Sequence, residues 1–148
     1  MTSRIAEKTL LKPVKRFLRD QGCVFLRPEL RFFDRGIDLY ALAHEPDHSY
    51  AIELKVVDWQ KALRQAAIYQ LCADFCYVAM PIEHTTRVNL DNFRHAGVGL
   101  LGVYLGGNFV TEVLAPKASA VKNQFYSRSI QQSFESLGRR KVNAIRSS

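Results

Sequence analysis

The chain of 148 residues has little of what marks several specialised classes of protein. Its three cysteines, Cys23, Cys72 and Cys76, lack the spacing of a disulfide framework, which indicates a reducing compartment, and we expect the cytoplasm. No apolar run approaches the ~20 residues of a membrane span, and residues 1–8 contain no hydrophobic signal-peptide region. A glycine-rich phosphate loop, a Gly-x-Ser-x-Gly elbow, a Cys-x-x-Cys pair and internal repeats are also absent. We therefore expect a protein with no membrane-spanning segment.

The chain does have a large apolar fraction and an excess of basic residues. Apolar residues make up 47%, which is typical of a globular protein, and the net charge is +7. Residues 1–36 carry nine Lys/Arg and four Asp/Glu, residues 37–119 carry six and nine, and residues 120–148 carry six and one. Two basic ends therefore flank a mildly acidic middle, a distribution that suits a polyanion at the ends and a divalent cation between them.

Two predicted strands carry the residues that are most informative about chemistry. The first covers residues 37–42 and contains Asp38, and the second covers residues 50–57 and contains Glu53 and Lys55. A polar turn with a proline connects them, so we expect an antiparallel hairpin with Asp38 opposite or next to Glu53 or Lys55. Because side chains alternate along a strand, Glu53 and Lys55 should share a face. The hairpin therefore gathers two carboxylates and one ammonium.

This cluster has two interpretations. On a solvated face it would be a cross-strand ion pair that contributes little to stability. Both strands are apolar almost throughout, however, so we expect them to be buried on both faces. Charges in such a place need a metal or a close partner, which favours a functional site.

The order of these residues resembles the signature of the PD-(D/E)XK nucleases, in which a strand Asp precedes (D/E)-x-K on the next strand. Asp38 follows Ile37, where the signature has proline, and Glu53-x-Lys55 supplies the second part. The helix predicted after the lysine strand also resembles the family, in which it often carries a glutamine facing the site. The resemblance covers about residues 7–81.

Two further residues join the candidate site through the same resemblance. Gln65 lies on the helix predicted for residues 59–74, and its alternative role is that of a surface polar residue. Glu7 lies near the buried stripe of a helix predicted for residues 3–21 and resembles a helical glutamate of the family; the alternative is an acid favoured by the helix dipole. Glu29 competes with Glu7, but it stands between two arginines on a predicted strand. We expect Glu7 rather than Glu29 in the site.

The resemblance implies a metal-dependent DNA endonuclease that leaves a 5′-phosphate. Hard oxygen ligands suit Mg²⁺ or Mn²⁺, which would polarise the scissile phosphate and lower the pKa of a bound water. Lys55 would orient that water or stabilise the developing charge, and Gln65 completes the implied catalytic set. The implied metal ligands are Asp38, Glu53, the carbonyl of Leu54 and Glu7.

The predicted elements give an α/β fold with a central mixed sheet flanked by helices. Their order is helix, three strands, helix, strand, then a further helix, a hairpin around Gly106-Gly107 and a helix over residues 118–137. A strand–helix–strand unit of this length indicates a parallel crossover. The resemblance implies a restriction-endonuclease-like core. We expect one domain over residues 1–137 and a basic, disordered tail over residues 138–148.

We expect DNA as the partner, with a homodimer and a protein that supplies specificity as further possibilities. One rival is a catalytically inactive, nuclease-like subunit that binds DNA or serves assembly. The other is a structural domain whose acids and lysine pair internally. Metal titration separates these, because an internally paired domain should not bind Mn²⁺ through Asp38 and Glu53.

Overall fold

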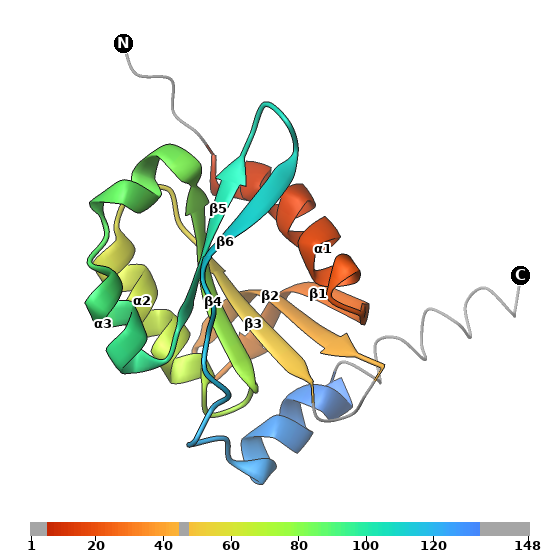
Figure 1. The fold of residues 1–148 in the computed structure, drawn as a ribbon. Helices are drawn as coiled ribbons and strands as arrows, with labels where there is room; N and C mark the ends of the chain where they lie inside the picture. Colours follow the sequence, from red (N-terminus) through yellow and green to blue (C-terminus); the bar gives the residue numbers. More distant parts are fainter. Residues whose placement is uncertain (1–5, 45–47, 134–148) are drawn as a thin grey trace, which may run out of the picture.

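The computed structural model describes residues 6–44 and 48–133, which fold around one six-stranded sheet (Figure 1). Strand order across the sheet follows the chain. The strands are β1 (Cys23–Phe32), β2 (Arg35–Ala43), β3 (Ser49–Leu54), β4 (Phe75–Pro81), β5 (Gly99–Tyr104) and β6 (Phe109–Leu114). Strands β3, β4 and β5 run parallel, whereas β1/β2, β2/β3 and β5/β6 are antiparallel pairs. The predicted α/β fold with a mixed sheet is confirmed.

Helices cover both faces of the sheet, as Figure 1 shows. One face packs against α1 (Leu11–Asp20), which follows the short 3-10 helix η1 (Glu7–Leu10). The opposite face packs against α2 (Trp59–Tyr69), α3 (Leu90–Ala96) and the helical residues 124–133. A second 3-10 helix, η2 (Ile82–Arg87), connects β4 to α3. Among the described residues no helix is both long and apolar enough to cross a membrane.

The N-terminal helix begins later than the predicted range of residues 3–21. Residues 3–5 of that range lie outside the described residues, and the α-helical hydrogen bonding starts at Leu11. Pro13 therefore falls in the first turn of α1. Main-chain N–H groups there have no partner within the helix, so the missing N–H of proline costs no hydrogen bond. Leu10, Val14 and Leu18 are fully buried against the sheet, as their helical spacing predicts.

Strand β3 is buried along its whole length, as its apolar sequence predicts. Tyr50, Ile52 and Leu54 face the core under α1, whereas Ala51 faces the core under α2. The strand ends at Leu54 and not at residue 57. The three cysteines are unpaired and buried among apolar side chains.

The crossover from β3 to β4 is parallel, as predicted. Asp58 caps α2, because its carboxylate accepts a hydrogen bond from the Lys61 N–H at 3.2 Å. The helix ends at Tyr69 and does not extend to residue 74. On the β5–β6 hairpin, Tyr104 and Phe109 form the last pair, so the loop has four residues rather than the predicted two.

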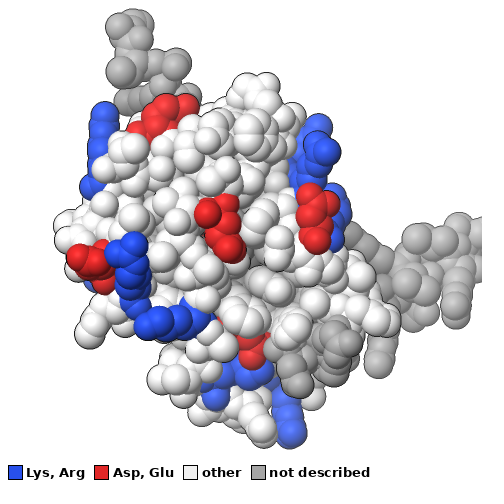
Figure 2. All heavy atoms as spheres, in the orientation of Figure 1, with Lys and Arg blue, Asp and Glu red and all other residues white. Residues whose placement is uncertain are grey.

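Basic side chains do not form one continuous patch on the face drawn in Figure 2. Lys and Arg lie there in separate groups towards the edge of the outline, with Asp and Glu beside and between them. Part of the basic N-terminal charge lies on η1 and α1, where Lys8, Lys12, Arg16 and Arg19 are exposed. The basic tail predicted for residues 138–148 lies outside the described residues.

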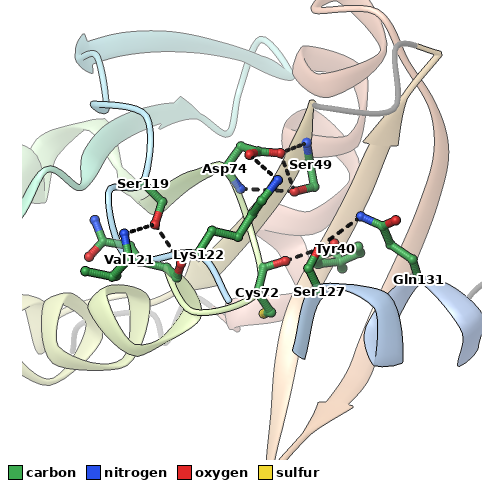
Figure 3. A network of polar contacts seen from close by, with 10 residues as sticks. Tyr40, Ser49, Cys72, Asp74, Ser119, Val121, Lys122, Ser127 and Gln131 are labelled. Atoms are coloured by element: carbon green, nitrogen blue, oxygen red, sulfur yellow. Dashed lines mark hydrogen bonds and ion pairs between the residues drawn. The ribbon is translucent and has the colours of Figure 1, made fainter. Parts of the chain in front are cut away.

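The C-terminal segment is tied to the loop between α2 and β4 before its helix begins (Figure 3). The Ser119 hydroxyl donates to the Gln70 carbonyl at 2.7 Å, and the Lys122 ammonium lies 2.6 Å from the Asp74 carboxylate. The same carboxylate accepts from the N–H and hydroxyl of buried Ser49. These long-range contacts hold residues 118–123 outside a helix, so the helix predicted from residue 118 was placed too early.

Candidate active site

Asp38 and Glu53 meet where β2 and β3 stop pairing. The last antiparallel pair at this end is Leu39 with Ile52, and one residue further Asp38 and Glu53 would stand opposite each other. Asp38 instead accepts a hydrogen bond on Oδ2 from the Leu54 main-chain N–H at 2.8 Å. A side chain therefore takes the place of a main-chain acceptor, and it fixes the Asp38 carboxyl beside the end of β3.

The Glu53 side chain is almost completely buried and has two polar neighbours. The residue is 7% exposed, and its Oε2 accepts a hydrogen bond from the Tyr69 hydroxyl at 2.7 Å. The Tyr69 oxygen also lies 3.3 Å from the Gly36 carbonyl at the start of β2. The second polar neighbour is the carboxyl of Asp38, with which Glu53 shares a hydrogen bond.

The electrostatics of this pair favour one shared proton. Burial, followed by the charge of Asp38, raises the pKa of Glu53 to about 8. Burial also raises the pKa of Asp38, while the hydrogen bond from Leu54 opposes that rise. The charge of Lys55 lowers both pKa values. At neutral pH the two carboxyl groups therefore carry about one negative charge between them.

Lys55 stands directly after β3 and pairs with an acid from η1. Its main-chain N–H continues the ladder by donating to the Ala79 carbonyl at 3.0 Å. Its ammonium lies 3.6 Å from Oε1 of Glu7, with side-chain exposures of 23% for Lys55 and 48% for Glu7. Among the described residues the ammonium of Lys55 forms its ion pair with Glu7, while its charge also lowers the pKa of Asp38 and of Glu53.

A small pocket opens at this end of the sheet on the side of α1. Its volume is about 160 Å³, and its lining residues are Glu7, Lys8, Leu11, Pro28, Glu29, Asp38 and Leu54. Glu29 stands beside Asp38 in the β1–β2 register and has a left-handed backbone, with φ of 55°. Glu7 and Glu29 thus both reach the pocket. The charge of Glu7, which also pairs with Lys55, contributes to the raised pKa of Asp38.

Gln65 does not join the polar contacts of the pair. It is half-buried on α2, one helical turn before Tyr69, and its side chain forms no hydrogen bond with the part of the chain that the structure describes. Leu54 contributes its N–H to Asp38, and its side chain is buried in the core.

Two neighbours of the site were not identified from the sequence. Tyr69 belongs to the buried stripe of α2, a place typical of a packing residue, yet its hydroxyl holds Glu53. Its position four residues after Gln65, on nearly the same helix face, is the only sequence signal for this role. The second is His84 of η2, whose Nδ1 lies at hydrogen-bond contact with the carbonyl of Val56, just beyond Lys55.

The donor set has the chemistry of a site for a hard divalent cation. Two adjacent carboxyl groups that compete for one proton offer oxygen ligands to a cation that could replace the proton. Among the described residues, no three or more His, Cys, Asp and Glu side chains form a group able to hold a metal. An ion here would therefore depend on two carboxylates, a main-chain carbonyl and water.

Comparison with known proteins identifies the fold without identifying a function. No family model matches the chain, and no curated protein is similar to it. The solved structure of SPO1766, a protein of unknown function from Silicibacter pomeroyi, is similar with a TM-score of 0.73 and 19% sequence identity. The match covers 98% of this chain and 94% of that one, so the two share a fold over nearly their whole length.

Proposed function

We propose that the protein is a metal-dependent nuclease of the PD-(D/E)XK type that acts on DNA. The observation that carries the proposal is the hydrogen bond from the Leu54 N–H to Asp38, because it places the Asp38 carboxyl beside Glu53 and next to Lys55. The order of helix, three antiparallel strands, helix and parallel strand supports a restriction-endonuclease-like core.

Asp38 and Glu53 would hold Mg²⁺ or Mn²⁺, with the Leu54 carbonyl as a third ligand by resemblance. Such an ion supplies polarisation of the scissile phosphate and a bound water of lowered pKa. The Tyr69 hydroxyl holds Oε2 of Glu53, and the Asp38 carboxyl lies beside the same side chain. Glu53 must give up its proton before it can act as a ligand.

Lys55 is suited to a role at the phosphate because it is close to both carboxyls yet partly exposed. Its ammonium would orient the attacking water or offset charge that develops on the phosphate. Glu7 holds this ammonium at 3.6 Å in the free protein and would position it, or approach a bound ion through water. Gln65 would contact the ion's water shell or the DNA backbone from α2.

One observation favours the rival of a nuclease-like subunit that binds DNA without cutting it. The polar groups of the site are satisfied internally, since Glu53 is held by Tyr69 and Lys55 by Glu7. An inactive relative would retain such pairs as structural contacts. The two functions differ in whether Asp38 and Glu53 bind a divalent cation.

A cleavage screen with matched variants tests the proposal. Plasmid, branched and single-stranded DNA are incubated with Mg²⁺ or Mn²⁺, and Mn²⁺ binding is measured by calorimetry. Asp38→Asn should lose both metal binding and cleavage, whereas Lys55→Ala should bind Mn²⁺ and fail to cut. The control Asp91→Asn changes an acid on α3 whose side chain is 87% exposed, and it should cut like wild type. Absence of cleavage by pure wild type, or equal activity in all variants, would contradict the proposal.

A further inference from the structure

Exposed aromatic side chains gather at the tip of the β1–β2 hairpin. Phe33, in the turn between β1 and β2, is 60% exposed, and Phe125, at the start of the helical residues 124–133, is 75% exposed. Tyr126 lies between them, with ring centroids 5.1 Å from Phe33 and 5.7 Å from Phe125. We call Phe33, Tyr126 and Phe125 the aromatic ridge.

Two hollows adjoin Phe33, and an arginine lines each of them. One pocket is lined by Phe33, Asp34, Arg35 and Ile68 of α2. The other is lined by Arg31, Phe32, Phe33, Phe125, Tyr126, Ser129, Ile130 and Ser133. Both arginines are exposed. Arg35 forms an ion pair with Asp34, and the 3.9 Å between Nε and Oδ1 makes it a weak contact.

The ridge stands at the same end of the sheet as the carboxyl pair. Gly36 directly follows Arg35, and its carbonyl lies 3.3 Å from the Tyr69 hydroxyl that donates to Glu53 at 2.7 Å. Tyr69 therefore connects the base of the hairpin to the candidate active site.

We propose that the aromatic ridge binds unpaired bases of DNA, with Arg31 and Arg35 contacting the adjacent phosphates. Base faces are hidden inside a duplex but free in a single strand, where they stack on aromatic rings with little dependence on sequence. Guanidinium groups beside such rings can contact the phosphates of the same strand. The inference rests on the proposed function, and it specifies a substrate with an unpaired segment next to the scissile bond.

Binding measured without metal tests this inference separately from cleavage. The anisotropy of a fluorescein-labelled oligothymidylate is followed in EDTA, and a blunt duplex of equal length serves for comparison. Phe33→Ala and Phe125→Ala should each weaken binding of the oligothymidylate roughly 5- to 100-fold, the range expected when one base stack is removed. Phe33→Trp should retain the affinity, because the indole ring also stacks. The control Phe109→Ala changes a phenylalanine on β6 that is 52% exposed, and it should bind like wild type.

The design remains decisive if one variant folds poorly. Phe33 packs on Phe32 with ring centroids 4.5 Å apart, whereas Phe125 is the more exposed ring, so Phe125→Ala is the safer substitution. Unchanged oligothymidylate binding in Phe125→Ala, or tighter binding of wild type to the duplex, would overturn the inference. So would sedimentation showing that the ridge substitutions dissociate a dimer while DNA binding is unaffected. A protein that cuts nothing but binds through the ridge would overturn the nuclease proposal alone.

Discussion

Glu53 should make the metal-free protein lose stability as the pH rises. Burial and the charge of Asp38 raise the pKa of Glu53 from 4.5 to about 8 in the folded state. The folded protein therefore holds this proton more tightly than the unfolded chain does. The resulting stabilisation is complete below the unfolded pKa and disappears as the pH rises through the folded pKa.

The size of the effect follows from the width of this pH window. A fully linked proton changes the free energy of unfolding by about 1.4 kcal/mol per pH unit, so the whole window from 4.5 to about 8 corresponds to roughly 4–5 kcal/mol. No large reduction for solvent screening applies, because the residue is 7% exposed. Asp38, whose pKa burial also raises, adds to the loss.

Urea denaturation in EDTA between pH 5 and pH 8 measures this loss. Glu53→Gln keeps an oxygen that can accept from Tyr69 but has no proton to lose, so its stability should fall much less with pH than that of wild type. Glu83→Gln, at an exposed position of η2, should fall as wild type does. Parallel curves for wild type and Glu53→Gln would refute the assignment of a buried, protonated Glu53.

Three further substitutions or deletions test other parts of the molecule. In urea denaturation, Tyr69→Phe should lower the free energy of unfolding by about 0.5–1.5 kcal/mol at pH 5 and by about 1.5–3 kcal/mol above pH 8, because a hydrogen bond to a charged acceptor is stronger. The control is Tyr40→Phe, since the Tyr40 hydroxyl donates to the neutral Cys72 carbonyl. Its effect on the free energy of unfolding should not change in this way with pH. Asp74→Ala should destabilise the fold by roughly 2–4 kcal/mol, measured in the same way, since buried Ser49 loses its acceptor and Lys122 its partner. Deleting residues 138–148 should reduce the salt dependence of duplex binding by about 0.9 in log–log slope for each phosphate that the tail neutralises, and an unchanged slope would show that the tail does not bind DNA.

The sequence predicts the sheet well because its signals are local. Apolar runs and the turn between them give the β2–β3 hairpin, and the hairpin register brings Asp38 beside Glu53. The helix cap at Asp58 and the short apolar strand that follows α2 give the parallel crossover. Each strand also pairs with its neighbour in the chain, so no long-range order had to be inferred.

The features that could not be predicted depend on contacts between distant segments. The C-terminal helix starts late because Ser119 and Lys122 bind the α2–β4 loop, which no pattern in residues 118–123 indicates. The ion pair of Lys55 with Glu7 requires η1 to lie over the end of β3. The hydrogen bond from the Tyr69 hydroxyl to Glu53 forms because the Glu53 carboxyl is buried beneath α2. The spacing of residues on α2 alone shows only that the Tyr69 ring is buried.

The departures from ordinary folding rules cluster at one end of the sheet, and this supports a functional site independently of any resemblance. Among the described residues Glu53 is the only buried Asp, Glu, Lys, Arg or His, although an apolar residue at the end of β3 would avoid its desolvation. The Asp38 carboxylate accepts a hydrogen bond from the Leu54 N–H, where a sheet would have a main-chain acceptor. Nearby, Glu29 and Phe33 adopt left-handed backbone conformations. The burial of Glu53 and the left-handed conformations of two non-glycine residues cost stability, and a fold retains such costs where binding or chemistry needs them. The buried carboxyl of Glu53, beside Asp38, therefore supports the active site proposed at the ends of β2 and β3.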